Sequence, residues 1–122
     1  MREASEMTGL VVEDEWLLRL ELVEELRRAG WRIVEAATGE EALALLEKGE
    51  QFDFLVTDIR LPGAVDGWQI AQSARARYPV LTVIYVSANP IDEQRRVADS
   101  IFLGKPCDIA ALVEACDRMV RR

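Results

Sequence analysis

The chain has 122 residues, the length of one domain; half of them are hydrophobic and 30% are charged, a balance typical of a folded globular protein. Asp and Glu number 22 against 15 Lys and Arg, so the net charge of −7 disfavours direct binding to a nucleic-acid backbone. The sequence contains no histidine, which excludes His-ligated zinc and both Ser-His-Asp and Cys-His catalysis. Any chemistry must therefore use carboxylates, hydroxyls and lysine.

The two cysteines, Cys107 and Cys116, are too few for a disulfide framework and are interpreted as reduced thiols. The best apolar run, residues 80–88, is far shorter than the roughly 18 residues of a membrane-spanning helix. Acidic residues near the N-terminus are not typical of a secretory signal. We therefore predict a cytoplasmic protein without a membrane segment, in which residues 1–7 form a loose N-terminal stretch.

Short apolar runs alternate with helical patterns in the first half of the chain. Residues 10–12 are predicted to form a buried strand, and apolar residues at helical spacing then indicate a helix that ends near Gly30. Residues 32–36 are predicted to form the second strand. Thr38 and Glu41 have the spacing of a capping box, which predicts the start of the second helix.

The alternation continues through the third and fourth strands. Residues 52–57 are predicted to form the third strand, and Asp66 with Gln69 is predicted to cap the following helix. Residues 80–86 are the most β-branched run in the chain. They are therefore predicted to form a central strand that is covered on both faces.

The last elements complete five strand–helix units. Residues 91–98 are predicted to form a short helix, residues 101–103 the fifth strand, and the final helix is predicted to begin near Asp108. Strict alternation predicts an α/β fold: a doubly wound, five-stranded parallel sheet with helices on both faces. We expect residues 1–122 to form a single domain.

Polar side chains follow four of these predicted strands. Glu13 and Asp14 follow the first strand, Asp58 the third and Ser87 the fourth, while Lys105 comes shortly after the fifth. Each residue alone has an ordinary structural explanation as a helix-start acid, a turn residue, a cap or a solvated charge. Because ligands bind at the carboxyl ends of parallel strands, the five together predict a binding site.

The chemistry of this group favours a hard cation and a phosphoryl group. Two carboxylates ~4 Å apart repel by ~4 kcal/mol at an effective dielectric constant of 20, so a cluster of three needs a cation or protons. Oxygen ligands without histidine or thiolate favour Mg²⁺. With Mg²⁺ bound, one carboxylate becomes a competent nucleophile toward phosphorus. Lys105 and Ser87 then supply a positive charge and a hydrogen bond to the phosphoryl oxygens.

Four motifs, in the same order along nearly the whole chain, resemble the receiver domain of two-component response regulators. They are Val11-Val12-Glu13-Asp14-Glu15, Val56-Thr57-Asp58-Ile59-Arg60-Leu61-Pro62, Val86-Ser87-Ala88 and Gly104-Lys105-Pro106. The resemblance implies the flavodoxin-like fold of the chemotaxis regulators, with strand order 2-1-3-4-5. It also implies a phosphoprotein that signals by phosphorelay rather than an enzyme with turnover.

The resemblance further implies roles for the acidic residues. Asp58 matches the phospho-acceptor, which receives a phosphoryl group from a phosphohistidine on a sensor histidine kinase or a histidine phosphotransfer protein. Glu13 and Asp14 match the acidic pair that holds Mg²⁺, and Asp58 with the backbone carbonyl of Arg60 completes the expected ligand set.

The remaining matches concern the response to phosphorylation. Ser87 matches the hydroxyl that moves toward the phosphoryl group, and Lys105 matches the lysine that bridges it. Phe102 holds the position of the aromatic switch residue. The Lys105–Pro106 peptide resembles one that is usually cis. The switched surface is expected to be read by another protein: a kinase, a phosphotransfer protein or a second copy in a homodimer.

The sequence also departs from the family pattern. The loop over residues 61–67 is one residue longer than usual, and residues 87–105 are shorter by roughly one helical turn, so the fourth helix is expected to be shortened. Cys107 stands where an aromatic residue is frequent. Arg60 and Asn89 occupy the two positions that tune autodephosphorylation in the family.

Two other functions and one wider context stay open at this stage. A Mg²⁺-dependent phosphohydrolase would need a second acid two residues after the nucleophile, where Arg60 stands. A receiver-like adaptor that acts without phosphorylation is the other alternative, and the shortened fourth helix keeps it open. The chain can also be part of a hybrid kinase or a longer regulator.

Overall fold

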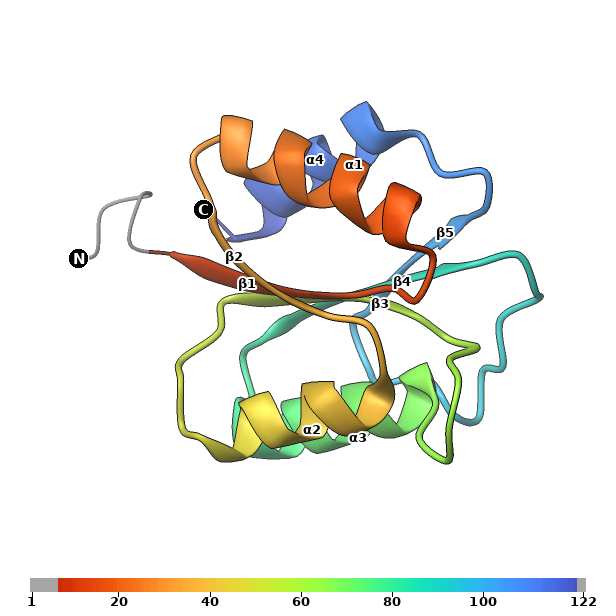
Figure 1. Cartoon of the computed structure of the whole chain (residues 1–122). Coiled ribbons are helices and arrows are strands. Elements are labelled where there is room, and N and C mark those ends of the chain that lie inside the picture. The colour runs from red at the N-terminus through yellow and green to blue at the C-terminus, as the bar shows by residue number, and fades with distance from the viewer. Residues whose placement is uncertain (1–6, 121–122) are drawn as a thin grey trace.

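The computed structural model describes residues 7–120, so nearly all of the predicted loose segment 1–7 lies outside the described residues (Figure 1). Five strands and four α-helices are found in the described part of the chain. In chain order they are β1 (Thr8–Val12), α1 (Trp16–Arg28), β2 (Arg32–Ala36), α2 (Gly39–Glu47), β3 (Phe54–Asp58), α3 (Gly67–Arg77), β4 (Thr82–Ser87), β5 (Ile101–Gly104) and α4 (Ile109–Val120).

The strands form one parallel sheet in the order β2-β1-β3-β4-β5, which confirms the predicted topology. Helices α1 and α4 lie side by side on one face, and α2 and α3 cover the other (Figure 1). Both sheet faces are therefore buried, which explains why β1 and β3 consist of continuous buried residues. None of the described helices is long and apolar enough to cross a membrane.

Two apolar layers make up the core, one on each face of the sheet. Leu10, Leu55 and Tyr85 belong to the layer beneath α2 and α3, whereas their strand neighbours Val11 and Val56 belong to the layer beneath α1 and α4. Successive strand residues point to opposite faces, so each inner strand contributes to both layers. This packing aligns the carboxyl ends of the strands at one edge.

Both predicted helix caps form. The Thr38 hydroxyl accepts a hydrogen bond from the Glu41 backbone N–H at 3.1 Å, although the Glu41 carboxylate contacts the Thr38 hydroxyl rather than its backbone. Asp66 and Gln69 form the complete reciprocal capping box at the start of α3. Local sequence signals therefore set where these two helices begin.

Strand boundaries and one strand position differ from the sequence-based prediction. β3 begins at Phe54 and β4 at Thr82, two residues later than predicted in each case. Val80 is 96% exposed, because the Leu81 N–H bonds back to the Tyr78 carbonyl in a turn that precedes the strand. The central strand is β3, while β4 is the next strand, buried and flanked on both sides.

The predicted short helix over residues 91–98 does not form. This segment contains turns and irregular backbone only. The fourth helix, which was expected to be shortened, is therefore missing altogether from the described residues. A single α-type turn bonds the Arg96 N–H to the Asp92 carbonyl at 3.1 Å. Beyond it, α3 side chains satisfy the backbone: Gln72 donates to the Arg95 carbonyl at 2.9 Å and Arg75 donates to the Ala98 carbonyl at 2.6 Å. The tertiary contacts replace the hydrogen bonds that a helix would supply.

Candidate functional site

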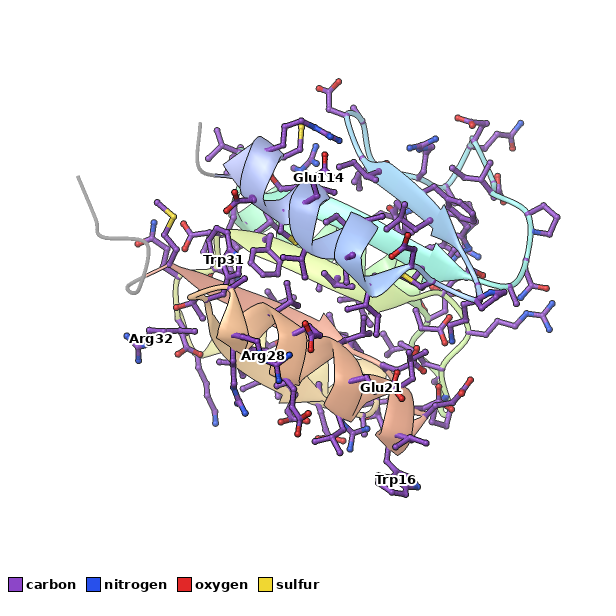
Figure 2. All side chains as sticks on the ribbon, turned by 90° about the horizontal axis from the view of Figure 1, so that it is seen from above. Trp16, Glu21, Arg28, Trp31, Arg32 and Glu114 are labelled. Carbon is purple, nitrogen blue, oxygen red and sulfur yellow. The ribbon has the colours of Figure 1, made fainter. Side chains whose placement is uncertain are left out.

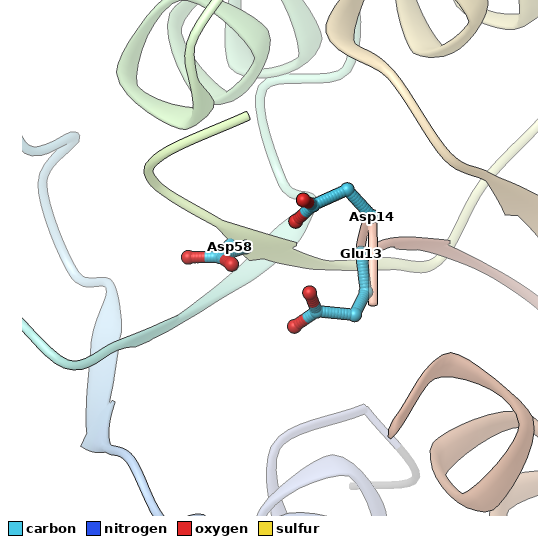
Figure 3. A group of neighbouring side chains, drawn as sticks. All are labelled: Glu13, Asp14 and Asp58. Carbon is cyan, nitrogen blue, oxygen red and sulfur yellow. The ribbon is translucent and has the colours of Figure 1, made fainter. Parts of the chain in front are cut away.

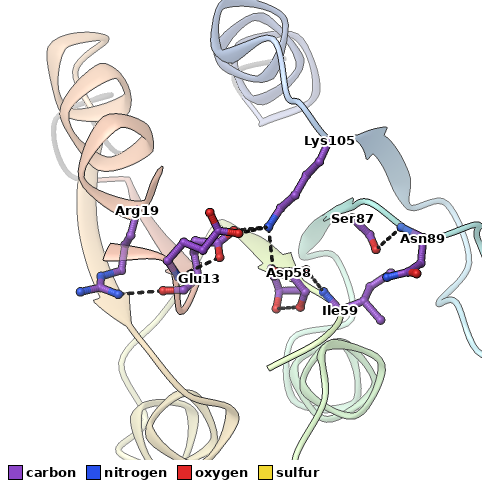
Figure 4. Close-up of polar contacts among 9 residues, drawn as sticks. Glu13, Arg19, Asp58, Ile59, Ser87, Asn89 and Lys105 are labelled. Atoms are coloured by element: carbon purple, nitrogen blue, oxygen red, sulfur yellow. Dashed lines mark hydrogen bonds and ion pairs between the residues drawn. The ribbon is translucent and has the colours of Figure 1, made fainter. Parts of the chain in front are cut away.

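The five polar residues predicted at the strand ends lie at the same edge of the sheet (Figures 3 and 4). Strand register produces this arrangement, since Val12 pairs with Thr57, Asp58 with Val86 and Ser87 with Gly104. The ends of β1, β3, β4 and β5 are therefore level with one another. Residues as far apart in sequence as Glu13 and Lys105 are thereby brought into contact.

Three carboxylates form a compact acidic cluster. One oxygen each from Glu13, Asp14 and Asp58 lies within 4.8 Å of the others (Figure 3). Glu13 and Asp58 are buried, while Asp14 is exposed at the mouth of the cluster. An all-oxygen donor set with one side open to solvent fits a hard cation that keeps several waters, which is the preference of Mg²⁺. The donor chemistry of the cluster is therefore suited to this ion.

Lys105 lies between two of these carboxylates. Its ammonium nitrogen is 2.8 Å from Asp58 Oδ2 and 2.9 Å from Glu13 Oε1 (Figure 4). The expectation that a lysine at this strand end is solvated in the free protein is wrong, because only 15% of its side chain is exposed. Burial alone would lower the pKa of Lys105, but the hydrogen bonds to Asp58 and Glu13 hold that pKa above its usual range. The lysine thus stays charged and offsets the carboxylate repulsion.

Glu13 is fixed by contacts at both ends of the residue. Its backbone N–H extends the β1–β2 ladder to the Ala36 carbonyl at 3.1 Å, and its carboxylate accepts the Glu15 N–H at 3.1 Å. Burial, with a smaller contribution from the neighbouring Asp58 charge, raises the pKa of Glu13 to about 7, although Lys105 and the Glu15 N–H oppose this rise. This carboxyl can therefore exchange a proton near neutral pH.

The Asp58 carboxylate is oriented from two sides. Oδ1 accepts the Ile59 N–H at 2.7 Å, and Oδ2 accepts from Lys105. The start of α3 packs closely behind it, because a Cβ on Gly67 would lie 2.1 Å from the Asp58 carbonyl oxygen. The Gly67 N–H also bonds to the Ile59 carbonyl at 2.8 Å. Only glycine fits this close approach, a role that the Asp66-Gly67 sequence could have indicated but that our sequence analysis missed.

Ser87 and Phe102 lie on the two strands beyond β3. Ser87 is 1% exposed, and its hydroxyl accepts the Asn89 N–H at 3.0 Å (Figure 4). Its carbonyl accepts the Lys105 N–H at 2.9 Å. Phe102 is half-buried against the core layer beneath α2 and α3. The hydroxyl is thus held in a local turn, and the aromatic ring is partly accessible.

Two further features concern the Lys105–Pro106 peptide bond and the loop that follows β3. The Lys105–Pro106 peptide is cis, as the resemblance implied. The Arg60 side chain is exposed and forms no ion pair within the described part of the chain, so it does not pair with the acidic cluster. Two residues after Asp58, Arg60 lies in the loop that leaves β3.

A parallel sheet of order 2-1-3-4-5 with an acidic cluster and a lysine at its carboxyl edge defines a class of signalling domain. The family profile described as the response regulator receiver domain matches residues 10–117. The chain therefore belongs to the receiver domain family of two-component response regulators.

Individual relatives support this assignment. The transcriptional regulatory protein PdtaR of Mycobacterium tuberculosis is 33% identical, over 93% of this chain and 56% of that protein. The sensor kinase CckA of Brucella abortus is 31% identical, over the whole of this chain and 14% of that protein. This chain thus spans about half the length, or less, of these relatives.

Solved structures show the same fold. A response regulator receiver protein from Sinorhizobium medicae superposes with a TM-score of 0.89 at 34% identity, covering 94% of both chains. The receiver domain of the hybrid histidine kinase CckA superposes with a TM-score of 0.80 at 32% identity, covering 93% of this chain and 98% of that one. Receiver domains similar to this chain are therefore found in a response regulator receiver protein and in a hybrid histidine kinase.

Proposed function

We propose that Asp58 accepts a phosphoryl group from a phosphohistidine, in a Mg²⁺-dependent step, and that this switches a surface used in protein–protein signalling. The donor would be a sensor histidine kinase or a histidine phosphotransfer protein. The observation that carries the proposal is the position of the Asp58 carboxylate, which lies between an acidic pair and a half-buried lysine. Family membership supports the signalling role.

The transfer step uses the Asp58 carboxylate as the nucleophile. An Asp58 oxygen attacks phosphorus as the phosphorus–nitrogen bond of the donor histidine breaks, and the electron pair returns to the imidazole. The Ile59 N–H holds one carboxylate oxygen of Asp58 in place, which orients the nucleophile before attack. Glu13, Asp14, Asp58 and the Arg60 carbonyl would hold Mg²⁺, which when bound offsets the repulsion between the carboxylate and the phosphoryl oxygens.

Lys105 and Ser87 would respond to the new charge. The Lys105 ammonium already contacts Asp58, so a small movement lets it bind a phosphoryl oxygen. The Ser87 hydroxyl would leave the Asn89 N–H and donate to another phosphoryl oxygen. The space that Ser87 vacates admits the half-buried ring of Phe102, which gives a two-state element biased by one charge change.

This function is a stoichiometric switch rather than enzymatic turnover. We propose that residues 1–122 act as one receiver unit, read by another protein: a kinase, a phosphotransfer protein or a second copy in a homodimer. The acidic composition favours protein partners over direct nucleic-acid contact. The expected cytoplasmic location stays a prediction from the sequence.

Mass spectrometry after incubation with acetyl phosphate and Mg²⁺ tests the proposal. We expect one added phosphoryl group on the wild-type chain, none on Asp58→Asn, and one on the control Asp117→Asn, which removes an exposed carboxylate from α4. No addition to the wild type would favour an adaptor that acts without phosphorylation. Continuous release of phosphate at many turnovers would favour a phosphohydrolase.

A further inference from the structure

Arg19, on the second turn of α1, is joined to the acidic cluster through the backbone. Its Nη1 donates to the Glu13 carbonyl oxygen at 2.8 Å (Figure 4). Its Nε donates to Glu35 Oε1 on β2 at 3.0 Å. The guanidinium therefore links strand β2 to the loop that carries the acidic pair, although it touches none of the three carboxylates of the cluster.

The same strand also holds the other side of the Glu13 backbone, because the Glu13 N–H bonds to the Ala36 carbonyl. The Glu13 carbonyl in turn accepts a hydrogen bond from Arg19, which pairs with Glu35 on β2. Both polar groups of the Glu13 backbone are therefore tied to β2, one directly and one through Arg19. The planar guanidinium suits this role, since its donors have a fixed fork geometry that a single ammonium lacks.

The Glu13 carbonyl belongs to the peptide that leads into Asp14. Within the described residues Asp14 forms no hydrogen bond or ion pair of its own, and its side chain is exposed. The orientation of the Glu13–Asp14 peptide therefore determines where the Asp14 carboxylate lies relative to Glu13 and Asp58. A residue that fixes this peptide fixes the spacing of the acidic cluster.

We propose that Arg19 is a positioning residue for the metal-binding acidic pair: by bridging Glu35 and the Glu13 carbonyl, it holds Asp14 in place for the divalent cation. This inference rests on the proposed function, because it concerns the Mg²⁺ site of that function. It adds a residue outside the four motifs that indicated the site. The sequence alone did not indicate it, since an arginine on a helix that packs against the sheet by its apolar residues is ordinarily a solvated charge.

The sign of the effect separates positioning from simple charge. Arg19 carries a positive charge near the cation site, so removing that charge alone would tighten Mg²⁺ binding. Loss of positioning would weaken it, as loss of partners that orient metal ligands does. The two explanations thus predict opposite changes in the dissociation constant.

Calorimetric titration with Mg²⁺ on the full chain provides the test. We expect Arg19→Gln to raise the Mg²⁺ dissociation constant by about three- to tenfold, and Arg19→Lys to raise it less, because an ammonium can still donate to the Glu13 carbonyl but lacks the fork that also reaches Glu35. The matched control is Arg27→Gln: Arg27 is on the same helix and also faces Glu35, at 4.0 Å, but donates to the Ile33 carbonyl instead. We expect its dissociation constant to stay within about twofold of wild type.

Thermal melting identifies a temperature at which each variant is folded, and Arg19→Lys serves as the test if Arg19→Gln does not fold. Unchanged or tighter Mg²⁺ binding in the folded Arg19 variant would overturn the positioning role. The proposed function would still stand in that case, provided that the wild-type chain binds Mg²⁺ and becomes phosphorylated on Asp58. A wild-type chain that binds no Mg²⁺ would overturn both.

Discussion

At the scale of single residues, the site contains like charges held together by one cation. Glu13 and Asp58 are both buried, and Lys105 is the basic side chain that contacts them. A buried ion pair is weak support for stability as a whole, but removing one partner leaves the other charge buried and uncompensated. The stability of the metal-free protein should therefore depend on both Lys105 and the protonation of Glu13.

We expect Lys105→Ala to lower the free energy of unfolding by about 2 kcal/mol at neutral pH, because the Glu13 and Asp58 carboxylates lose their shared cation. Urea denaturation in the absence of Mg²⁺ measures this change. Lys48→Ala is the matched control, since Lys48 is exposed at the end of α2, and it should change stability by less than about 0.5 kcal/mol. Equal stability of the two variants would show that Lys105 is solvated after all.

The raised pKa of Glu13 predicts a dependence of stability on pH. The folded carboxyl has a pKa of about 7, whereas the unfolded one has the ordinary value of 4.5. Between these values the folded state binds the proton and the unfolded state does not, so the Glu13 contribution to stability falls as pH rises. The glutamine of Glu13→Gln cannot titrate. We therefore expect the free energy of unfolding of this variant, relative to that of wild type, to increase by about 1–3 kcal/mol as pH rises from about 5 to 8.

Urea denaturation in EDTA at the two pH values measures this gain. Lys105 does not contribute to it, because the pKa of Lys105 is raised above its usual range and the ammonium is charged throughout the interval. The control is Asp14→Asn, which removes the exposed carboxylate of the same cluster and leaves the buried Glu13 carboxyl in place. If the difference in free energy of unfolding between wild type and Glu13→Gln does not vary with pH, then the raised pKa of Glu13 is not the cause of the pH dependence.

At the scale of elements, helix α1 is unusual in exposing large apolar side chains. Trp16, Leu17 and Leu20 are 67%, 54% and 44% exposed, and Figure 2 shows Trp16 pointing away from the start of α1. A groove lined by Leu17, Ile109 and Lys105, among others, runs from this helix to the site. If Asp58 is the phospho-acceptor, as proposed above, this apolar surface is suited to docking of the proposed phosphohistidine donor.

We expect Leu17→Asp to slow phosphoryl transfer from a phosphorylated histidine phosphotransfer protein by about tenfold or more, because a charge would disrupt apolar contact at the interface. Phosphorylation by acetyl phosphate should stay within about twofold, since that donor needs no docking surface. The control is Val80→Asp, which adds the same charge at a 96% exposed position before β4. A similar loss with both donors would place the effect of Leu17 on the site itself.

At the scale of the whole molecule, an ion pair and side-chain hydrogen bonds join the β4–β5 connection to helix α3. Arg95 pairs with Asp66 at 3.1 Å, and the Tyr85 hydroxyl in the core accepts the Val97 N–H at 3.0 Å. Because Ser87 opens this connection and Phe102 lies just beyond it, a change at Asp58 should propagate along β4, the connection and β5. Helix α2 contacts the β3–α3 loop at its first residues, where Glu40 accepts the Ala64 N–H at 3.0 Å and Gly39 packs against Val65.

We expect beryllofluoride with Mg²⁺ to shift backbone amide signals across residues 87–109 and to leave residues 42–47 of α2 nearly unchanged. The physical reason is that Ser87 and Lys105 are the donors nearest to the new charge, while the body of α2 packs against α3, β1 and β2. Two-dimensional NMR on the wild type measures the shifts, with Asp58→Asn as the control. Equal shifts in both regions, or none in either, would contradict a switch through Ser87 and Phe102.

The sequence by itself determined the sheet and the composition of the site. Apolar runs alternating with helical spacing predicted five parallel strands, and the caps at Thr38 and Asp66 form where predicted. The site was also predictable, because parallel strands place their carboxyl ends at one edge, where Glu13 and Asp14 follow β1 and Asp58 ends β3. These features depend on periodicity and on residues near one another in the chain.

Only the tertiary structure decided the features that depend on distant contacts. Lys105 turned inward because two buried carboxylates, one of them 47 residues away, attract its ammonium. Residues 91–98 form no helix, and α3 side chains instead donate hydrogen bonds to two carbonyl groups of this segment. The contact of Arg19 with the Glu13 carbonyl needed β2 to bring Glu35 alongside. Such contacts follow from the packing of the whole chain, which local pattern and propensity do not contain.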